Sequence, residues 1–264
     1  MTTPALYIET QGQGPALVLL HGWGLHGGVW DSLMPRLTPH LKVTRVDLPG
    51  HGRSRQVPMP HSLTELTLQV MAMVPPGSVV LGWSLGGLVA LEAALRMPQR
   101  LRGLVLANTT PRFVTAADWS HAMPPDQLQE FATGLSGDYR ETLHRFLSLQ
   151  VRGDESARAA LRSLRDSLFA YGEPDTAALA TGLELLRSSD LRSGLKDIAL
   201  PTLVLAGAYD RLTPPGASEY MAKAIPGARM EVFPKSAHAP FISHTEDFTA
   251  SLLKFMNQLD KAAA

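Results

Sequence analysis

A serine lies between two glycines in the segment Gly82-Trp83-Ser84-Leu85-Gly86. This spacing fits the G-x-S-x-G pattern, in which a sharp strand-to-helix turn leaves the serine hydroxyl exposed at the head of a helix. The run SVVL before it is typical of a buried strand, and LGGLVAL after it is typical of a helix. A side chain at either glycine would crowd so tight a turn. The context therefore favours Ser84 as a nucleophile over a serine that only caps a helix.

A serine hydroxyl is a weak nucleophile until a base takes its proton. With an elbow serine, the acid and then the histidine follow along the chain, and four of the nine histidines come after Ser84. His121 and His144 lie in a helical stretch, and His244 begins the closing helix. His238 lies in the loop KSAHAPF directly after the last strand, where it is free to reach over the serine. We therefore predict that His238 is the base.

The carboxylate that orients the histidine should end the preceding strand. The apolar run LVLAGAYD ends at Asp210. Asp210 would accept the Nδ1–H of His238, fix the tautomer of the ring and stabilise the imidazolium. Asp190 and Asp197 precede that strand and are weaker candidates, and the alternative for Asp210 is a cap of the following turn.

Attack on an ester creates an oxyanion that needs aimed N–H donors. We expect one donor to be the amide of Leu85, next to the nucleophile, and the other to be the amide of Trp23 in the loop HGWG. We interpret His21, in the same loop, as a local hydrogen-bonding residue. His51, in DLPGHGRS, belongs in our interpretation to a turn that prolines and glycines shape beside the site.

Strands and helices alternate around these residues. Strand-like runs fall within 15–22, 42–50, 78–84, 100–111, 201–215 and 228–241. Helix-like stretches cover 62–74, 85–98, 215–224 and 245–258. This alternation predicts an α/β fold with a mostly parallel central sheet flanked by helices and joined by right-handed crossovers.

The alternation breaks between about residues 112 and 195, where the chain looks wholly helical. We interpret this segment as a lid over the carboxyl ends of the strands, where open α/β sheets keep their sites. The predicted organisation is a core of residues 1–111 and 196–264 with a helical lid subdomain at 112–195.

The composition argues against several classes of function. The 264 residues carry 24 basic and 24 acidic side chains, which gives no support for nucleic-acid or membrane-surface binding. The absence of cysteine excludes disulfides, thiolate catalysis and cysteine-based zinc sites. No H-E-x-x-H pattern or carboxylate cluster suggests a metal, and we expect no cofactor. Without a signal-like start or a run of ~18 apolar residues, we expect a cytoplasmic protein, most simply a monomer.

Taken together, HGWG, DLPGHGRS, GWSLGG, GAYDRLTP and AHAPF resemble the α/β-hydrolase superfamily over the whole chain. Within it the chain is similar to the pimeloyl-acyl-carrier-protein methyl ester esterases of biotin synthesis. The segment RFLSLQ in the insertion and the helix with Arg158 and Arg162 add to this similarity. The resemblance implies hydrolysis of the methyl ester on a carrier-bound pimeloyl chain, through a Ser-His-Asp acyl-enzyme mechanism. It also implies that the substrate site is lined by Trp23, Ser84, Leu85, Phe146, Leu147, Ser148, Leu149, Gln150 and His238.

The chemistry of the residues is compatible with that activity. Methanol is a poor leaving group, so protonated His238 would have to act as general acid. Apolar side chains of the lid could enclose the pimeloyl chain, or could merely pack the lid on the core; they are Phe131, Leu143, Phe146, Leu147 and Leu149.

The insertion is also locally basic. Arg158, Arg162 and Arg165 follow helical spacing and share one face. Because acyl carrier proteins are acidic, we predict a docking face that includes Arg145, Arg158 and Arg162. The alternative is a solvated face in which Asp154 pairs with Arg158.

Other functions remain open at this point. A broad carboxylesterase, a lactonase, a C–C bond hydrolase or a perhydrolase could share the triad. A ligand-binding protein on the same scaffold is a different class, although such proteins often lose a triad member. Dehalogenases and epoxide hydrolases are disfavoured because they attack with an aspartate at the elbow.

Overall fold

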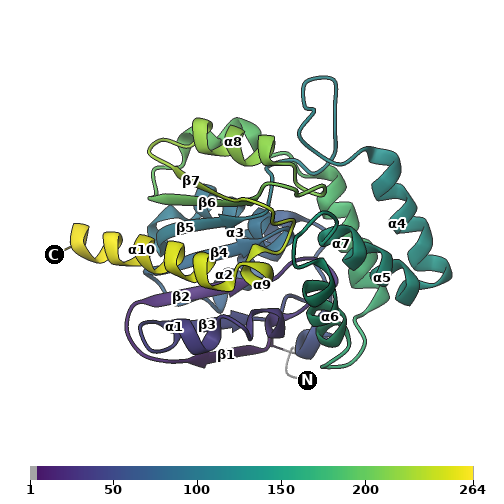
Figure 1. Cartoon of the computed structure of the whole chain (residues 1–264), viewed down its shortest axis with the longest axis horizontal. Coiled ribbons are helices and arrows are strands. Elements are labelled where there is room, and N and C mark those ends of the chain that lie inside the picture. The colour runs from purple at the N-terminus through teal and green to yellow at the C-terminus, as the bar shows by residue number, and fades with distance from the viewer. Residues whose placement is uncertain (1–4, 264) are drawn as a thin grey trace.

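A seven-stranded sheet forms the centre of the protein, in the strand order β1-β3-β2-β4-β5-β6-β7 (Figure 1). The computed structural model describes residues 5–263. The strands are β1 (Ile8–Gln11), β2 (Ala16–Leu20), β3 (Lys42–Val46), β4 (Ser78–Trp83), β5 (Leu101–Ala107), β6 (Thr202–Gly207) and β7 (Arg229–Phe233). Only β1 is antiparallel to its neighbour, and every other pair is parallel. The predicted mostly parallel α/β sheet is therefore confirmed.

The central strands are apolar along their whole length because both faces of the sheet are covered. All residues of β4 and β6 are buried. Strand β1 was not predicted, since its sequence IETQ is largely exposed and lacks an apolar run. It forms because β3 offers an unpaired edge, with Ile8 opposite Val46 in the register.

Helices flank the sheet and connect its strands. The longer ones outside the insertion are α2 (Leu63–Ala72), α3 (Leu85–Arg96), α8 (Pro215–Ala224) and α10 (Thr245–Ala263). Shorter helical segments are η1 (Gly27–Trp30), α1 (Met34–Leu37), η2 (Gly52–Ser54), η3 (Pro98–Arg100), η4 (Arg192–Asp197) and α9 (Pro240–Ser243). Within residues 5–263, none of the helices has both the length and the apolar character needed to cross a membrane.

Residues 112–191, between β5 and β6, are here called the insertion, which lies at one end of the sheet (Figure 1). It contains α4 (Pro125–Gly137), α5 (Tyr139–Gln150), α6 (Ala157–Leu168) and α7 (Thr176–Ser188). Its first part differs from the wholly helical prediction. Residues 112–124 form a loop closed by two isolated bridges, Val114 with Met123 and Ala116 with Trp119. Prolines at both ends of that loop and the buried Trp119 favour this irregular path over a helix.

The two ends of the insertion meet beneath it. The amide of Leu191 donates to the carbonyl of Pro111 at 2.9 Å, and Asp190 forms ion pairs with Arg192 at 2.7 Å and with Arg112 at 2.8 Å. Hydrogen bonds from Arg192 and then Arg112 outweigh partial burial and lower the pKa of Asp190 to about 2. The base of the insertion is thus closed by a backbone hydrogen bond and a cluster of charges.

Candidate active site

Ser84 lies at a strained turn between β4 and α3. Its backbone has φ 55° and ψ −118°, in a region that residues other than glycine rarely adopt. A Cβ on Gly82 would lie 2.2 Å from the carbonyl oxygen of Gly86, and one on Gly86 would lie 2.4 Å from that of Leu20. Both glycines are therefore needed for the turn, which holds Ser84 at the carboxyl edge of the sheet.

Asp210 and His238 form a buried pair after β6 and β7. The Nδ1 of His238 lies 2.7 Å from Asp210 Oδ2, which also accepts hydrogen bonds from Thr213 Oγ1 at 2.6 Å and Asn108 Nδ2 at 2.8 Å. The other oxygen, Oδ1, accepts from the amides of Leu212 and Thr213 at 2.8 and 3.0 Å. Burial alone would raise the pKa of Asp210, but the charge of His238 and these hydrogen bonds hold that pKa below its ordinary value.

Trp83 holds the His238 loop against the elbow. Its indole Nε1 donates to the carbonyl oxygen of His238 at 2.8 Å, and the two rings lie 5.4 Å apart. The Nε2 of His238 has no hydrogen-bond partner among the described residues, and the described hydrogen bonds include none between His238 and the Ser84 hydroxyl. With Nδ1 facing Asp210, Nε2 is the ring atom left to accept a proton.

The loop that follows β2 lies directly beside Ser84. A Cβ on Gly22 would be 3.1 Å from the Cβ of Ser84. In the part of the chain that the structure describes, no hydrogen bond uses the main-chain amide of Trp23 or of Leu85. Both amides therefore remain available as hydrogen-bond donors.

Two buried histidines support that loop from behind, as interpreted from the sequence. His21 bonds the carbonyl of Gly22 through Nδ1 at 2.8 Å and accepts the amide of Leu48 at Nε2, also at 2.8 Å. His51 bonds the carbonyl of Pro49 at 2.8 Å and accepts the amide of Gly24 at 3.2 Å. Accepting an N–H at Nε2 requires a neutral ring with its proton on Nδ1. Burial lowers the pKa of His21 to about 3 and also lowers that of His51.

The insertion covers the site through Trp23. The indole Nε1 of Trp23 donates to the carbonyl of Leu179 on α7 at 2.8 Å, and its ring packs in a T-shaped arrangement with Phe146 on α5, with ring centroids 4.8 Å apart. Phe146 in turn contacts Phe131 on α4, with ring centroids 5.4 Å apart. Under this cover the residue Ser84 is only 3% exposed.

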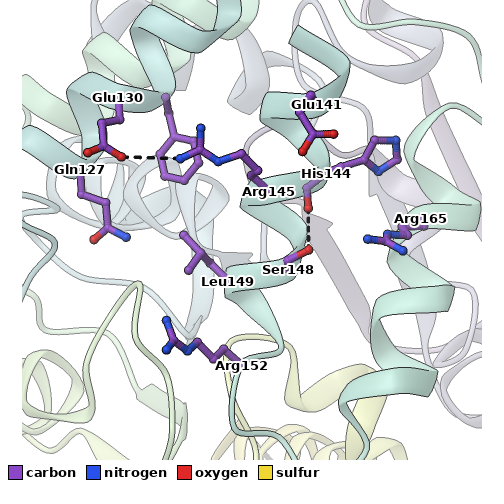
Figure 2. A pocket seen from close by; sticks show the side chains of 10 residues that line it. Gln127, Glu130, Glu141, His144, Arg145, Ser148, Leu149, Arg152 and Arg165 are labelled. Carbon is purple, nitrogen blue, oxygen red and sulfur yellow. Dashed lines mark hydrogen bonds and ion pairs between the residues drawn. The ribbon is translucent and has the colours of Figure 1, made fainter. Parts of the chain in front are cut away.

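The segment from Phe146 to Gln150 does not face one side, because successive residues on a helix point in different directions. Phe146, Leu147 and Gln150 are buried. Ser148 and Leu149 instead line a hollow of about 670 Å³ on the outer surface of the insertion (Figure 2). Of the five residues of this segment, Phe146 contacts Trp23, and the carbonyl of Gln150 accepts the amide of His238 at 2.9 Å.

The three arginines of the predicted docking face, Arg145, Arg158 and Arg162, are exposed. Arg145 borders the outer hollow, with its guanidinium 3.6 Å from Glu130 (Figure 2). Arg162 borders a second hollow of about 490 Å³ between α6 and the segment around η1. Arg158 is exposed on α6 and forms no ion pair among the described residues. The alternative ion pair between Asp154 and Arg158 is not among the ion pairs of the described residues. The Asp154 carboxylate instead accepts the amides of Ser156 and of Ala237, the residue before His238.

Two residues next to the Asp210–His238 pair were missed by the sequence analysis. Asn108, with φ 43°, donates through Nδ2 to both Asp210 and the carbonyl of Ala237. Its place directly after β5, at the same edge as Ser84, was the available signal. Thr213 follows Asp210 by three residues, a spacing typical of local side-chain hydrogen bonds. Across residues 5–263, no group of His, Asp and Glu side chains forms a metal-binding cluster.

Comparisons with known proteins extend these observations. Residues 15–245 match the profile of a family described as alpha/beta hydrolase fold. A Xanthomonas oryzae pv. oryzae protein named pimeloyl-[acyl-carrier protein] methyl ester esterase is 47% identical over 251 residues, covering 95% of this chain and 98% of that protein. The Nitrosomonas europaea protein of the same name is 43% identical, covering 93% and 97%.

Solved structures show the same architecture. A hydrolase from Pseudomonas aeruginosa PA01 superposes with a TM-score of 0.81 at 31% identity, covering 95% of this chain and 94% of that chain. An enol-lactonase from Burkholderia xenovorans LB400 superposes with a TM-score of 0.83 at 25% identity, covering 96% of each chain.

Proposed function

Because the chain belongs to the alpha/beta hydrolase fold family, we propose that it is a serine esterase that hydrolyses the methyl ester of pimeloyl-acyl-carrier protein. The relatives named for this activity align over nearly their full length. The observation that carries the mechanism is the buried Asp210–His238 pair, held by Trp83 beside the strained Ser84.

In the first half of the proposed reaction, His238 Nε2 takes the proton of the Ser84 hydroxyl as Oγ attacks the ester carbon. The amides of Trp23 and Leu85 donate to the oxyanion that forms. When the tetrahedral intermediate collapses, His238 returns the proton to the departing methoxy oxygen. Methanol leaves, and the acyl group remains on Ser84 as an ester.

In the second half, a water molecule attacks the acyl carbon and His238 takes its proton. As this intermediate collapses, the bond between Ser84 Oγ and the acyl carbon breaks and His238 returns the proton to Oγ, which releases free pimeloyl-carrier protein. Asp210 keeps the proton of His238 on Nδ1 and stabilises the imidazolium in both halves. The lowered pKa of Asp210 keeps its carboxylate ionised for this role.

The carrier protein would dock on the exposed arginines of the insertion. Arg145, Arg158 and Arg162 are exposed on α5 and α6, whereas Ser84 is buried. An acidic carrier would be attracted to them without touching the reacting ester. We further propose a monomer, since one chain supplies the triad and both oxyanion donors, and a cytoplasmic location, which follows from the proposed carrier-bound substrate.

The direct test is methanol release from the methyl ester of pimeloyl-carrier protein, compared with free dimethyl pimelate and a simple lactone. We expect kcat/KM to be highest for the carrier-bound ester, with Ser84→Ala as the inactive control. A protein that hydrolyses the lactone well and leaves the carrier-bound ester intact would contradict the proposal and favour a lactonase.

A further inference from the structure

The turn between α5 and α6 forms hydrogen bonds with the main chain of the loop that contains His238. The amide of His238 donates to the carbonyl of Gln150 at 2.9 Å. The amide of Ala237 donates to the carboxylate of Asp154 at 3.0 Å. Two successive N–H groups at the proposed base are therefore bound by the insertion and not by the sheet.

The core holds the same loop by its carbonyl oxygens. The Tyr209 amide donates to the Ser236 carbonyl at 2.8 Å, and Asn108 donates to the Ala237 carbonyl at 3.0 Å. Trp83 bonds the carbonyl of His238, as described above. A peptide group that is hydrogen-bonded only through its carbonyl oxygen can rotate about that hydrogen bond. The orientation of this loop therefore depends both on the core, which binds its carbonyl groups, and on the insertion, which binds its N–H groups.

Asp154 is the buried ionisable group in this contact. It is 7% exposed, and among the described residues its carboxylate has no cationic partner. Its oxygens instead accept from the Ala237 amide, from Ser236 Oγ at 3.3 Å and from the Ser156 amide at 2.8 Å. Hydrogen bonds to an ionised acceptor are roughly twice as strong as neutral ones.

The neighbouring contacts are more exposed. The ion pair between Lys235 and Glu155, at 3.3 Å, joins side chains that are 66% and 48% exposed. Such a pair contributes little to stability. The contribution of the turn side chains to the loop is therefore concentrated in Asp154.

We propose that Asp154 is a positioning residue, which fixes the His238 loop so that Nε2 stays aligned with the Ser84 hydroxyl. The inference rests on the proposed function, since it assigns His238 as the base. It also means that the alignment of the base depends on the contacts between the His238 loop and the turn between α5 and α6. A misplacement of about 1 Å at a reacting group can lower the rate about 100-fold.

The matched variants are Asp154→Ala and Asp175→Ala. Asp175 is also an aspartate of the insertion, and like Asp154 it accepts the amide two residues ahead, here that of Ala177 at 2.8 Å, but it does not bond the His238 loop. The assays are kcat and KM for a small activated ester, the unfolding midpoint, and hydrogen exchange of the amides of Ala237 and His238.

We expect Asp154→Ala to lower kcat roughly 10- to 100-fold with a much smaller change in KM, and to speed exchange at the two loop amides. Asp175→Ala should lower the unfolding midpoint with kcat and loop exchange near wild type. Asp154→Asn, which keeps one acceptor oxygen, should recover part of kcat.

Wild-type kcat and exchange in Asp154→Ala would overturn the inference, as would an equal loss of kcat in Asp175→Ala. If the wild type hydrolyses no ester, the proposed function fails, whereas the exchange of the two amides still decides whether Asp154 holds the loop.

Discussion

Replacing Asp210 by asparagine tests the site most sharply, because the structure specifies what each carboxylate oxygen accepts. Oδ1 faces two backbone amides, those of Leu212 and Thr213. Oδ2 faces His238 Nδ1, Thr213 Oγ1 and Asn108 Nδ2. A side-chain amide has one oxygen, so one of these two groups of donors must face an NH₂ group.

The two backbone donors cannot reverse their direction, whereas the imidazole can change tautomer and the threonine hydroxyl can rotate. The new nitrogen should therefore replace Oδ2. It would then donate to Nδ1 of His238 and move the ring proton to Nε2, where the ring can no longer take the proton of Ser84. Loss of the correct tautomer costs roughly 10⁴-fold in kcat in a serine triad.

The same replacement carries a cost in stability. The Nδ2 group of Asn108 would face another NH₂ group and lose its acceptor in a buried site. One unsatisfied buried donor costs about 1–3 kcal/mol. Asp210→Asn should therefore fold, with a lower free energy of unfolding.

The assay is steady-state hydrolysis of an activated short-chain ester, with urea unfolding of the same preparations. Asp197→Asn is the matched control, since this aspartate is exposed and precedes β6. A kcat of Asp210→Asn within about tenfold of wild type would refute the reasoning, because the tautomer effect is expected to be about a thousand times larger. An equal loss in Asp197→Asn would also refute it.

Three further predictions concern the nucleophile, acid stability and docking. Ser84→Ala should abolish ester turnover with little change in the unfolding midpoint, and turnover near wild type in the pure variant would contradict the proposed mechanism. The unfolded chain protonates histidine near pH ~6.5, while the pKa of folded His21 is about 3. The unfolded chain therefore binds a proton that the folded chain excludes. The free energy of unfolding should be unaffected by His21 above pH ~6.5 and should decrease as the pH falls from there towards 3, by up to about 1.4 kcal/mol per pH unit. Urea unfolding at several pH values should show this decrease, and a smaller slope in His21→Gln would assign it. Reversing Arg158 and Arg162 to Glu should raise KM for the carrier-bound ester and leave KM for a small ester unchanged. The effect should be smaller in high salt, because added salt shortens the screening length from its value of about 8 Å at physiological ionic strength. Lys254→Glu on α10 is the control, and an equal loss on both substrates would mean that the insertion itself was damaged.

The core of the fold could be predicted because buried parallel strands have continuous runs of apolar residues in the sequence. The same runs located the strand ends at which Ser84, Asp210 and His238 lie. Strand β1 was not predicted because an edge strand can be polar. Its formation depends on pairing with β3 and not on burial of its side chains. The loop at 112–124 escaped because its path depends on long-range packing of Trp119.

The side-chain contacts of the site were less predictable than its elements. Nothing in the local pattern of DES at residues 154–156 indicates that Asp154 bonds the amide of Ala237, 83 residues along the chain. The five residues from Phe146 onward were treated as one lining segment, although a helix divides such a run between two faces. Asn108 lay at a predictable strand end, but its partner Asp210 is 102 residues away.

The closed base of the insertion has a consequence for how such proteins diversify. Pro111 and Leu191, where the insertion leaves and rejoins the core, are joined by a backbone hydrogen bond of 2.9 Å. A segment whose two ends already touch can be exchanged for one of another length or sequence at little cost, since the loop-closure entropy grows slowly with length. The sheet would keep its register, and the elbow would keep its geometry. Grafting a different helical segment between these two positions should therefore change which esters reach Ser84, provided that the new segment supplies the bonds that Gln150 and Asp154 give to the His238 loop.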